Sequence, residues 1–448
     1  MPGDQPAETI LREEAFAALL LPRAAPLRGV LEAVLTGSSP TLGKAAAADL
    51  LRACEELESF LDDHGARWNR RFAPVTELVA GLRSLAGAFF HLAHVQRRLP
   101  SYRLIPAIDD DRRQQWVSGL ERSITFVRGA CHRLASTCAA HFVRLEQQVA
   151  ASGSGTAKGT VTPISIGGAA AILVADGSPK LPRTLLHDEP HDEEQKIARV
   201  ATDYVELCEE VRPLIQAGRT DHPAGPWVRA SFSEARARTL AARVHNLQSA
   251  YDTYVGNTIL ESRDPRLAQL RGHSSLALHL FQAGVHLVHF RERYEAEDRA
   301  THLEEVLTSL VDPDELHGVV RDDLVLVACD IVLAGEDVAR ALVPSYTRVR
   351  ERRIVLDPET PLHARPAALV VAIVNHHGTP VELEIEGAIC NAASILEILM
   401  AVGSHPGASH VLFRGDERPL ADIERLFAAR LGEEGLESLP PELAYLRS

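Results

Sequence analysis

A histidine and an arginine lie two residues apart in the stretch DPETPLHARPAALVVAIVNHHG, at His363 and Arg365. Pro361 stops any helix before this point, and Pro366 is tolerated only in the first turn of a helix, so we predict that a helix begins near His363. The unpaired N–H groups of such a turn, the helix dipole and the Arg365 guanidinium together favour a dianionic group. Because imidazole is nucleophilic and titrates near neutrality, His363 can itself accept a phosphoryl group. The pattern therefore indicates a phosphohistidine site.

The alternative interpretation of the same residues is structural. His363 would then only cap the helix, and Arg365 would be a solvated side chain. The pair alone does not decide between these interpretations, so the elements around it matter.

Strands and helices alternate around this pair. The segments RRIVLD, VELEIEG and ASHVLFRG have the β-branched and alternating residues of strands. The segments ARPAALVVAIVNHHG, NAASILEILMAVG and PLADIERLFAARLGE have the periodicity of helices. The predicted order β-α-β-(β)-α-β-α is typical of a compact α+β domain.

With LHARPAALV after a strand and NAASILEILMAVGSHPG further along the chain, residues 352–433 resemble the HPr family of phosphocarrier proteins of the phosphoenolpyruvate-dependent phosphotransferase system. The resemblance implies an open-faced β-sandwich, in which three helices cover one side of a four-stranded antiparallel sheet. It implies that enzyme I phosphorylates His363 on Nδ1, that Arg365 steadies the phosphoryl group, and that Ala364 and Arg365 offer backbone N–H groups. It also implies an EIIA-like or regulatory protein as the acceptor, and no bound cofactor.

The helix predicted after NAAS carries further residues that the resemblance singles out. Ser394 stands at the position of the family's regulatory serine, which makes it a candidate for phosphorylation. With Glu397 it also forms an S-x-x-E capping box, so a structural role is the alternative. Leu396, Leu399 and Met400 correspond to the family's apolar patch that docks partners, whereas by sequence alone they are core residues.

The remainder of the chain is helical in pattern. Residues 1–149 and 191–349 are rich in Ala, Leu, Arg and Glu with helical spacing, and residues 150–190 form a Gly/Ser/Pro-rich linker or insertion. LESFLD in the first segment resembles LQSAYD in the second, and HLAHVQRR resembles HLVHFRER. We therefore predict a multidomain protein with a duplicated all-α region, followed by the α+β domain at 350–435 and a tail at 436–448.

Two H-x-x-H pairs lie in the helical segments, at His91 with His94 and at His286 with His289. Histidines three residues apart share one face of a helix and can supply two metal ligands, or act as phosphoacceptors. Neither motif includes a carboxylate or Cys ligand at fixed spacing, so no metal is predicted and the four histidines stay candidates only. The alternative is that neighbouring groups satisfy them in a core or an interface.

Composition limits the class of protein. Lys and Arg total 47 against 61 Asp and Glu, a net charge of −14, which argues against nucleic-acid binding. The six cysteines show no C-x-x-C spacing, and no apolar run approaches the length of a membrane span. A cytoplasmic protein without membrane insertion is expected.

Two functions follow from these observations. The first is a phosphocarrier that accepts a phosphoryl group on His363 and relays it in a regulatory context. The second is a regulatory interaction protein whose HPr-like domain is a docking module, with the helical domains as a sensor or as the contact of a homo-oligomer. The presence of both His363 and Arg365 favours the first.

Overall fold

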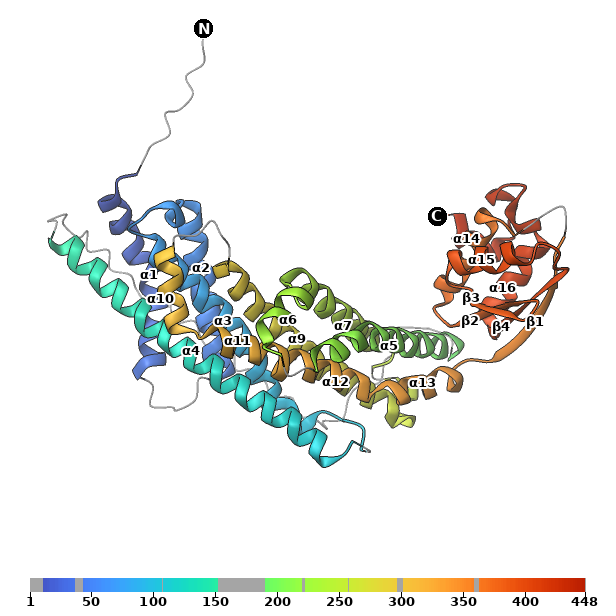
Figure 1. The fold of residues 1–448 in the computed structure, drawn as a ribbon, viewed down its shortest axis with the longest axis horizontal. Helices are drawn as coiled ribbons and strands as arrows, with labels where there is room; N and C mark the ends of the chain where they lie inside the picture. Colours follow the sequence, from blue (N-terminus) through green and yellow to red (C-terminus); the bar gives the residue numbers. More distant parts are fainter. Residues whose placement is uncertain are drawn as a thin grey trace, which may run out of the picture.

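The structure is a computed structural model (Figure 1). It describes residues 11–36, 43–106, 108–151, 190–219, 222–256, 258–295, 301–357 and 362–447. Almost all of the predicted linker, residues 152–189, and Pro361 lie outside the described residues.

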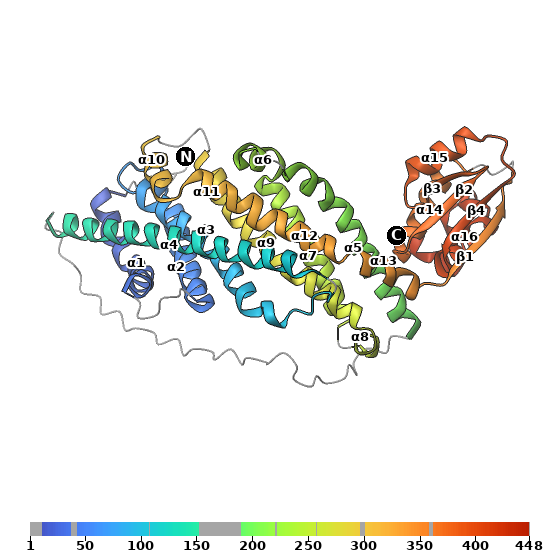
Figure 2. The same ribbon diagram turned by 60° about the horizontal axis from the view of Figure 1, so that its bottom comes forward.

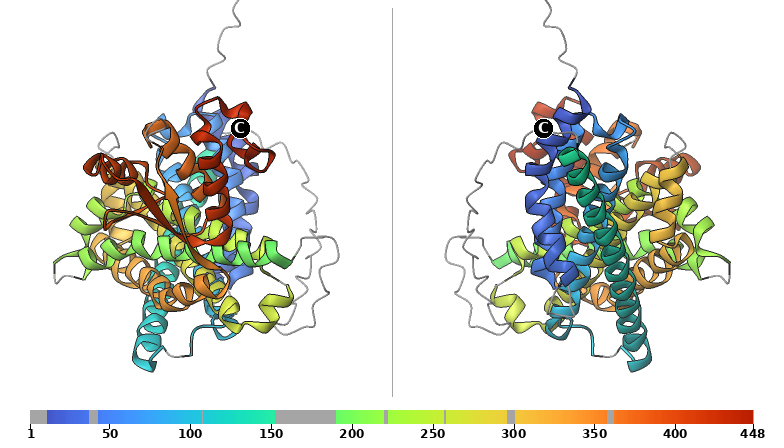
Figure 3. Two further views of the ribbon diagram at one scale, coloured as in Figure 1. Left: turned by 90° about the vertical axis from the view of Figure 1, so that its right-hand side faces the viewer. Right: turned by 90° about the vertical axis from the view of Figure 1, so that its left-hand side faces the viewer.

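The first helical segment is built on one apolar helix. Its helices are α1 (Glu13–Thr36), α2 (Lys44–Asp63), α3 (Ala73–Arg98) and α4 (Asp110–Ala151). By length and composition, α3 could cross a membrane. However, 78% of its apolar stretch is buried inside the protein, as expected of a core helix. It packs against α2 and α4, and α1 lies beside α4 (Figure 3).

The second helical segment contains more and shorter elements. They are α5 (Pro190–Gly218), α6 (Ala224–Ser231), α7 (Glu234–Tyr254), α8 (Ile259–Arg263), α9 (Pro265–Glu295), α10 (Thr301–Leu310), α11 (Pro313–Gly318), a π-helical turn (Val319–Val325), α12 (Leu326–Ala334) and α13 (Glu336–Ser345). Its central helix is α9, which packs against α7 and α12. This segment therefore also surrounds one buried helix.

The two central helices, α3 and α9, pack directly against each other. A single hydrophobic core consequently runs through both helical segments, from Phe16 to Leu342. Close approach depends on Gly87 of α3, because a Cβ atom there would clash with the ring of His286 on α9. The two predicted copies thus share one core, and their origin by duplication stays a prediction.

The C-terminal domain has its own core and follows the predicted element order. Its elements are β1 (Val349–Val355), α14 (Ala364–His377), β2 (Val381–Ile385), β3 (Ala388–Asn391), α15 (Ile395–Ser404), β4 (His410–Asp416) and α16 (Glu417–Ala428). The strands form one antiparallel sheet in the order β1-β4-β2-β3. In β2 the side chains of Val381, Leu383 and Ile385 are buried, as expected when helices cover one face of the sheet. A four-stranded antiparallel sheet with helices is therefore confirmed.

The chain after α16 differs from the prediction. The last predicted helix extends through residue 433, but α16 ends at Ala428, and Leu431 and Gly432 have φ angles of 57° and 71°. Three 3-10 helices follow α16, at Arg430–Gly432, Leu436–Ser438 and Pro441–Arg447. Leu439, Leu443 and Leu446 are buried in the C-terminal core, so residues 436–447 pack as part of this domain.

The C-terminal domain contacts the helical region at the N-terminal part of α5 (Figure 2). Gln195 Nε2 and His377 Nδ1 lie 3.0 Å apart, and Arg418 lies 3.7 Å from Glu194. Hydrophobic residues of the two regions form separate core clusters. The contact is therefore mainly polar.

The role of Gly87 in the α3–α9 packing can be tested by Gly87→Ala. Because the added methyl group has no room beside His286, we expect this change to destabilise the protein by about 1–3 kcal/mol. Gly29→Ala on α1 is the control, since nothing lies within 4 Å of its added Cβ atom. It should stabilise the protein by up to about 1 kcal/mol through helix propensity. Urea titration of both variants measures the difference, and equal shifts would contradict the proposed packing constraint.

Candidate functional site

His363 occupies the N-cap position of α14, as its place between prolines predicts. Its backbone is extended, with φ −94° and ψ −169°, and its carbonyl oxygen accepts a hydrogen bond from the Ala367 N–H at 3.0 Å. The His363 side chain makes no capping hydrogen bond, and half of its surface is exposed. The imidazole is therefore accessible to a partner protein.

The His363 imidazole contacts Glu433, which lies near the other end of the domain in the sequence. Its Oε1 lies 3.0 Å from His363 Nε2, and 35% of the Glu433 side chain is exposed. A carboxylate is a hydrogen-bond acceptor, so its position favours the tautomer with the proton on Nε2 and the lone pair on Nδ1. The sequence reasoning missed Glu433, because it placed this residue on a continuous helix.

The first turn of α14 contains the backbone N–H groups that the sequence predicts to bind an anion. The N–H groups of Ala364 and Arg365 have no acceptor within the helix, since both lie in its first turn, and Pro366 has no N–H group at all. The Arg365 side chain is exposed beside them. These donors and the positive end of the helix dipole favour negative charge next to His363.

Comparison with known proteins places this domain in a family. A family model described as the PTS HPr component phosphorylation site matches residues 350–418. The phosphocarrier protein HPr of Streptomyces coelicolor is 41% identical over 91 residues, which are 20% of this chain and 95% of that protein. Through its C-terminal domain, the chain belongs to the HPr family. The resemblance noted in the sequence is thereby confirmed for this domain. No solved structure matches the chain.

Ser394 is the N-cap residue of α15 in the HPr domain. Its side chain accepts a hydrogen bond from the Glu397 N–H at 3.4 Å. The Glu397 carboxylate does not return to Ser394, as a complete capping box requires, but accepts from the Asn391 N–H at 3.0 Å. Ser394 is half-buried and caps α15, so it has a structural role. Phosphorylation of Ser394 stays a prediction.

The three apolar residues of α15 differ in exposure. Leu396 and Met400 are 65% and 63% exposed, whereas Leu399 is half-buried against the core of the HPr domain. Ile389 on the neighbouring strand β3 is 65% exposed as well. A large apolar side chain on a surface commonly marks a contact with another protein when several occur together.

The candidate histidines of the helical region lie together between α3 and α9. His91 Nδ1 is 3.1 Å from Nδ1 of His279, a residue that the sequence reasoning missed. The ring of His279 also contacts His94, with centroids 4.2 Å apart, and the ring of His91 stacks on His286 at 5.7 Å. No motif marks His279, because it lies seven residues before His286 and only the packing of the two helices brings it into the cluster.

These histidines are held in the neutral form. Burial, followed by the neighbouring histidines, lowers the pKa of His91 to about 2. Burial is also the main cause that lowers the pKa of His279 to about 3 and the pKa of His286 and His94 to about 4. Among the residues that the structure describes, no three His, Cys, Asp or Glu side chains come together to hold a metal.

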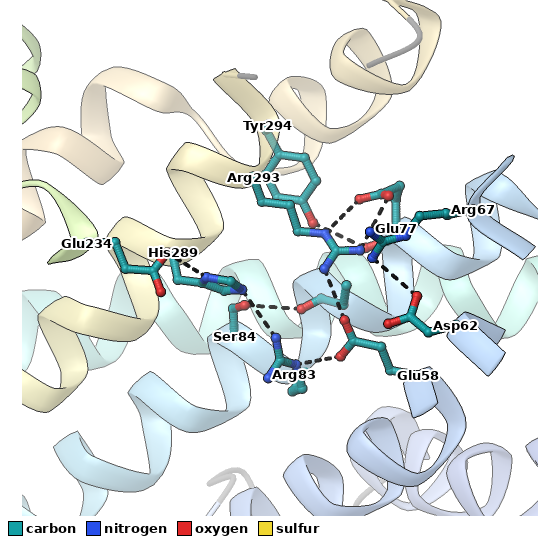
Figure 4. A network of polar contacts seen from close by, with 11 residues as sticks. Glu58, Asp62, Arg67, Glu77, Arg83, Ser84, Glu234, His289, Arg293 and Tyr294 are labelled. Atoms are coloured by element: carbon teal, nitrogen blue, oxygen red, sulfur yellow. Dashed lines mark hydrogen bonds and ion pairs between the residues drawn. The ribbon is translucent and has the colours of Figure 1, made fainter. Parts of the chain in front are cut away.

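His289 belongs instead to a network of polar contacts (Figure 4). Its Nδ1 lies 2.9 Å from the Glu234 carboxylate, and its Nε2 lies 3.2 Å from Arg83. Arg293, one turn further along α9, is buried between Glu58 and Glu77, each at 3.0 Å. Arg293 therefore joins α9 to α2 and α3. Because its buried charge is paired with two carboxylates, Arg293 has a structural role.

The histidine cluster predicts a dependence of stability on pH. The unfolded histidines titrate near 6.5 and the folded ones at about 4 or below, so the unfolded state binds more protons between these values. The free energy of unfolding should therefore fall as the pH drops from 7 to 5, by about 1–2 kcal/mol per histidine. His279→Gln should flatten this dependence, measured as the melting temperature against pH. The exposed His132 offers the control variant His132→Gln, and equal slopes in both variants would refute the role of the cluster.

Proposed function

We propose that the protein is a phosphocarrier of a phosphoenolpyruvate-dependent phosphotransferase system. His363 accepts a phosphoryl group from enzyme I and relays it to a protein acceptor, either EIIA-like or regulatory, in the cytoplasm. The observation that carries the proposal is the exposed imidazole of His363 at the start of α14, with the Glu433 carboxylate 3.0 Å from its Nε2. Membership of the HPr family supports it.

The transfer step uses groups that the HPr domain already positions. The lone pair of His363 Nδ1 attacks the phosphorus atom of the donor phosphohistidine, a new N–P bond forms, and the electron pair of the broken N–P bond returns to the donor imidazole. No proton needs to move, because Nε2 keeps its proton. The product ring gains positive charge, which the Glu433 carboxylate 3.0 Å from Nε2 stabilises.

Phosphate charge is stabilised on the other side of the ring. The N–H groups of Ala364 and Arg365, the Arg365 guanidinium and the N-terminal end of α14 supply hydrogen bonds and positive potential there. Because Glu433 holds the opposite edge of the imidazole, its negative charge and that of the phosphoryl group are separated by the ring. This arrangement supports a stable but reversible phosphohistidine.

A second candidate function is a docking module. The exposed Leu396, Met400 and Ile389 favour it, because a partner can bind this apolar surface without any phosphoryl transfer. In that case the helical region would be the sensor or the contact of a homo-oligomer. Both functions use the same HPr domain, and only the first requires His363.

The helical region is proposed to be an internal duplication. LESFLD lies on α2 and LQSAYD on α7, and the H-x-x-H pairs lie on α3 and α9, the partners against which α2 and α7 pack. The packing of α3 on α4 likewise corresponds to that of α9 on α12. Equivalent sequence matches on equivalently packed helices support a repeated unit.

The first test is transfer of labelled phosphate from phosphoenolpyruvate and enzyme I to the protein. We expect acid-labile label on the natural chain and none above background on His363→Ala. Because the His363 side chain makes no capping bond, the variant should lose less than about 0.5 kcal/mol of stability. His410→Ala, a second histidine of the HPr domain, should be labelled normally. Label on His363→Ala would refute the site, and label on neither protein would favour the docking module.

Glu433→Gln tests the positioning of the ring. An exposed ion pair contributes little energy, so the rate of phosphoryl acceptance should fall by about twofold to fivefold rather than vanish. Glu434→Gln is a matched control, because Glu434 is adjacent, 64% exposed and pairs with Arg430. Stopped-flow or quenched-flow labelling gives both rates. Equal rates in the two variants would show that Glu433 does not act on the reaction.

A further inference from the structure

A pocket with a volume of about 520 Å³ lies between the chain that joins α3 to α4, the N-terminal part of α4 and the N-terminal part of α9. Its volume lies in the range of small-molecule sites. Most of the side chains that line it are apolar or aromatic, and the larger of these are Leu99, Tyr102, Leu104, Trp116 and Val117. The polar side chains that line it are Arg103, Arg113 and Gln269. The lining therefore combines an apolar surface with positive charge.

The chain that joins α3 to α4 forms one wall of the pocket and is fixed against α9 and α12. The Arg103 backbone passes so close to Gly272 of α9 that a Cβ atom there would lie 2.7 Å from the Arg103 oxygen. The Ile105 N–H donates to Nε2 of the buried His273 at 3.2 Å. The other ring nitrogen, Nδ1, lies 2.8 Å from the Ile331 oxygen on α12, so the proton is on Nδ1 and Nε2 is an acceptor. A pocket with such a wall is largely pre-formed, and binding orders little of the chain.

The two arginines of the pocket keep charges that no ion pair neutralises. Arg113 Nη2 donates to the neutral backbone oxygen of Ile105 at 2.9 Å, and the buried Arg113 Nε has no hydrogen-bond partner among the described residues. Arg103 is exposed, and within the described part of the chain it forms no ion pair. Among the described residues that line the pocket, none is an Asp or a Glu. A guanidinium in this situation can bind an anion through two parallel hydrogen bonds.

The carboxylates around the pocket have other roles. Asp264, at the start of α9, binds the Arg266 guanidinium at 2.7 Å. Asp330 of α12 binds the Arg112 guanidinium at 2.8 Å. Residues 109–111 are aspartates that are exposed at the start of α4, where the helix dipole favours negative charge. The pocket therefore retains an excess of positive charge.

We propose that this pocket binds a small organic carboxylate with a flat apolar body. The carboxylate lies at Arg113 and Arg103, and the apolar body lies beside the aromatic rings of Tyr102 and Trp116. Because most of the lining is apolar, a singly charged carboxylate fits better than a phosphate dianion, which costs more to remove from water. The proposal does not depend on phosphoryl transfer at His363.

The pocket lies beside the chain that leads to the HPr domain. Pro265 lines the pocket and follows Asp264 in the sequence. The Tyr346 hydroxyl, shortly before β1, donates a hydrogen bond to the Asp264 carboxylate at 3.1 Å. The ligand site and the chain that enters the HPr domain are therefore attached to the same end of α9.

Binding is tested on the full chain by isothermal titration calorimetry with two probes. One is 1-naphthylacetate, a carboxylate on a flat apolar body, and the other is 1-naphthylacetamide, which has the same body without the charge. We expect the carboxylate to bind at least about tenfold more tightly than the amide, because the arginines form stronger hydrogen bonds with a charged acceptor. Equal affinities of the two probes, or no binding of the carboxylate, would overturn the proposal.

Arginine variants locate the carboxylate of the bound probe. Arg113→Gln should weaken binding of 1-naphthylacetate by about tenfold, and Arg103→Gln by about threefold because Arg103 is exposed. Arg144→Gln is the matched control, since Arg144 is an exposed arginine of the same helix and also donates to a backbone oxygen, that of Ala140 at 3.3 Å. It should leave the affinity within about twofold, as expected of a surface charge far from the site. Equal affinities of Arg113→Gln and Arg144→Gln would contradict the assignment.

A second pair of variants on α4 locates the apolar body. Val117→Phe fills the pocket and should weaken binding of 1-naphthylacetate by at least about tenfold, because the added ring occupies the space of the probe. Val143→Phe, at a position that is 46% exposed, should leave the affinity unchanged. Circular dichroism shows whether each variant folds, and the Arg103→Gln variant at an exposed position tests the site independently of the packing. Equal affinities of Val117→Phe and Val143→Phe would also overturn the proposal.

Discussion

The close packing of α3 against α9 is the constraint on which the helical region depends. Gly87 allows the approach, and the ring of His286 fills the space that a larger residue would occupy. Arg293 then fixes the relative position of the helices, because its buried guanidinium binds Glu77 on α3 and Glu58 on α2. A buried charge contributes little net stability, but it is costly when it loses its partners. The network therefore selects one arrangement of these helices over others that would bury similar apolar surface.

In the HPr domain, α14 connects two different sites. Its N-terminal end carries His363, which Glu433 holds. Its C-terminal end carries His377, which lies between Gln195 of α5 and Asp422 of α16, at 3.0 and 2.9 Å. The helix has 14 residues, so these ends are about 20 Å apart.

The segment after α16 touches both ends of α14. Glu433 reaches the N-terminal end, and Tyr445 stacks on the His376 ring with centroids 3.8 Å apart. Tyr445 also donates a hydrogen bond to Asp422 at 2.7 Å, the carboxylate that holds His377. Three buried leucines anchor this segment, so it belongs to the domain as a structural part and not as a loose end.

The features of the fold that depend on local sequence rules could be predicted from the sequence. The prolines around His363 predict the start of α14, alternating residues predict the strands of the HPr domain, and helical periodicity predicts the long helices. The sequence did not predict contacts that depend on tertiary packing. Glu433 reaches His363 only because the chain leaves the helix at Ala429. Arg430 and Leu431 follow with positive φ angles, which are uncommon for these residue types and which no sequence rule predicts here. His279 joins the histidine cluster only because α3 and α9 lie side by side.

The junction of the two regions explains how one chain can combine a large helical body with a domain that must meet other proteins. The helical core and the core of the HPr domain are separate, and the described contacts between them include Gln195 with His377 and Glu194 with Arg418. Interfaces of this kind permit relative motion of domains, because little apolar surface has to be exposed when they part. Helix α5 packs against α12 and α13, and its N-terminal part also carries the contacts to α14. The HPr domain is therefore joined to the helical region by polar contacts of α5 and not by a shared hydrophobic core.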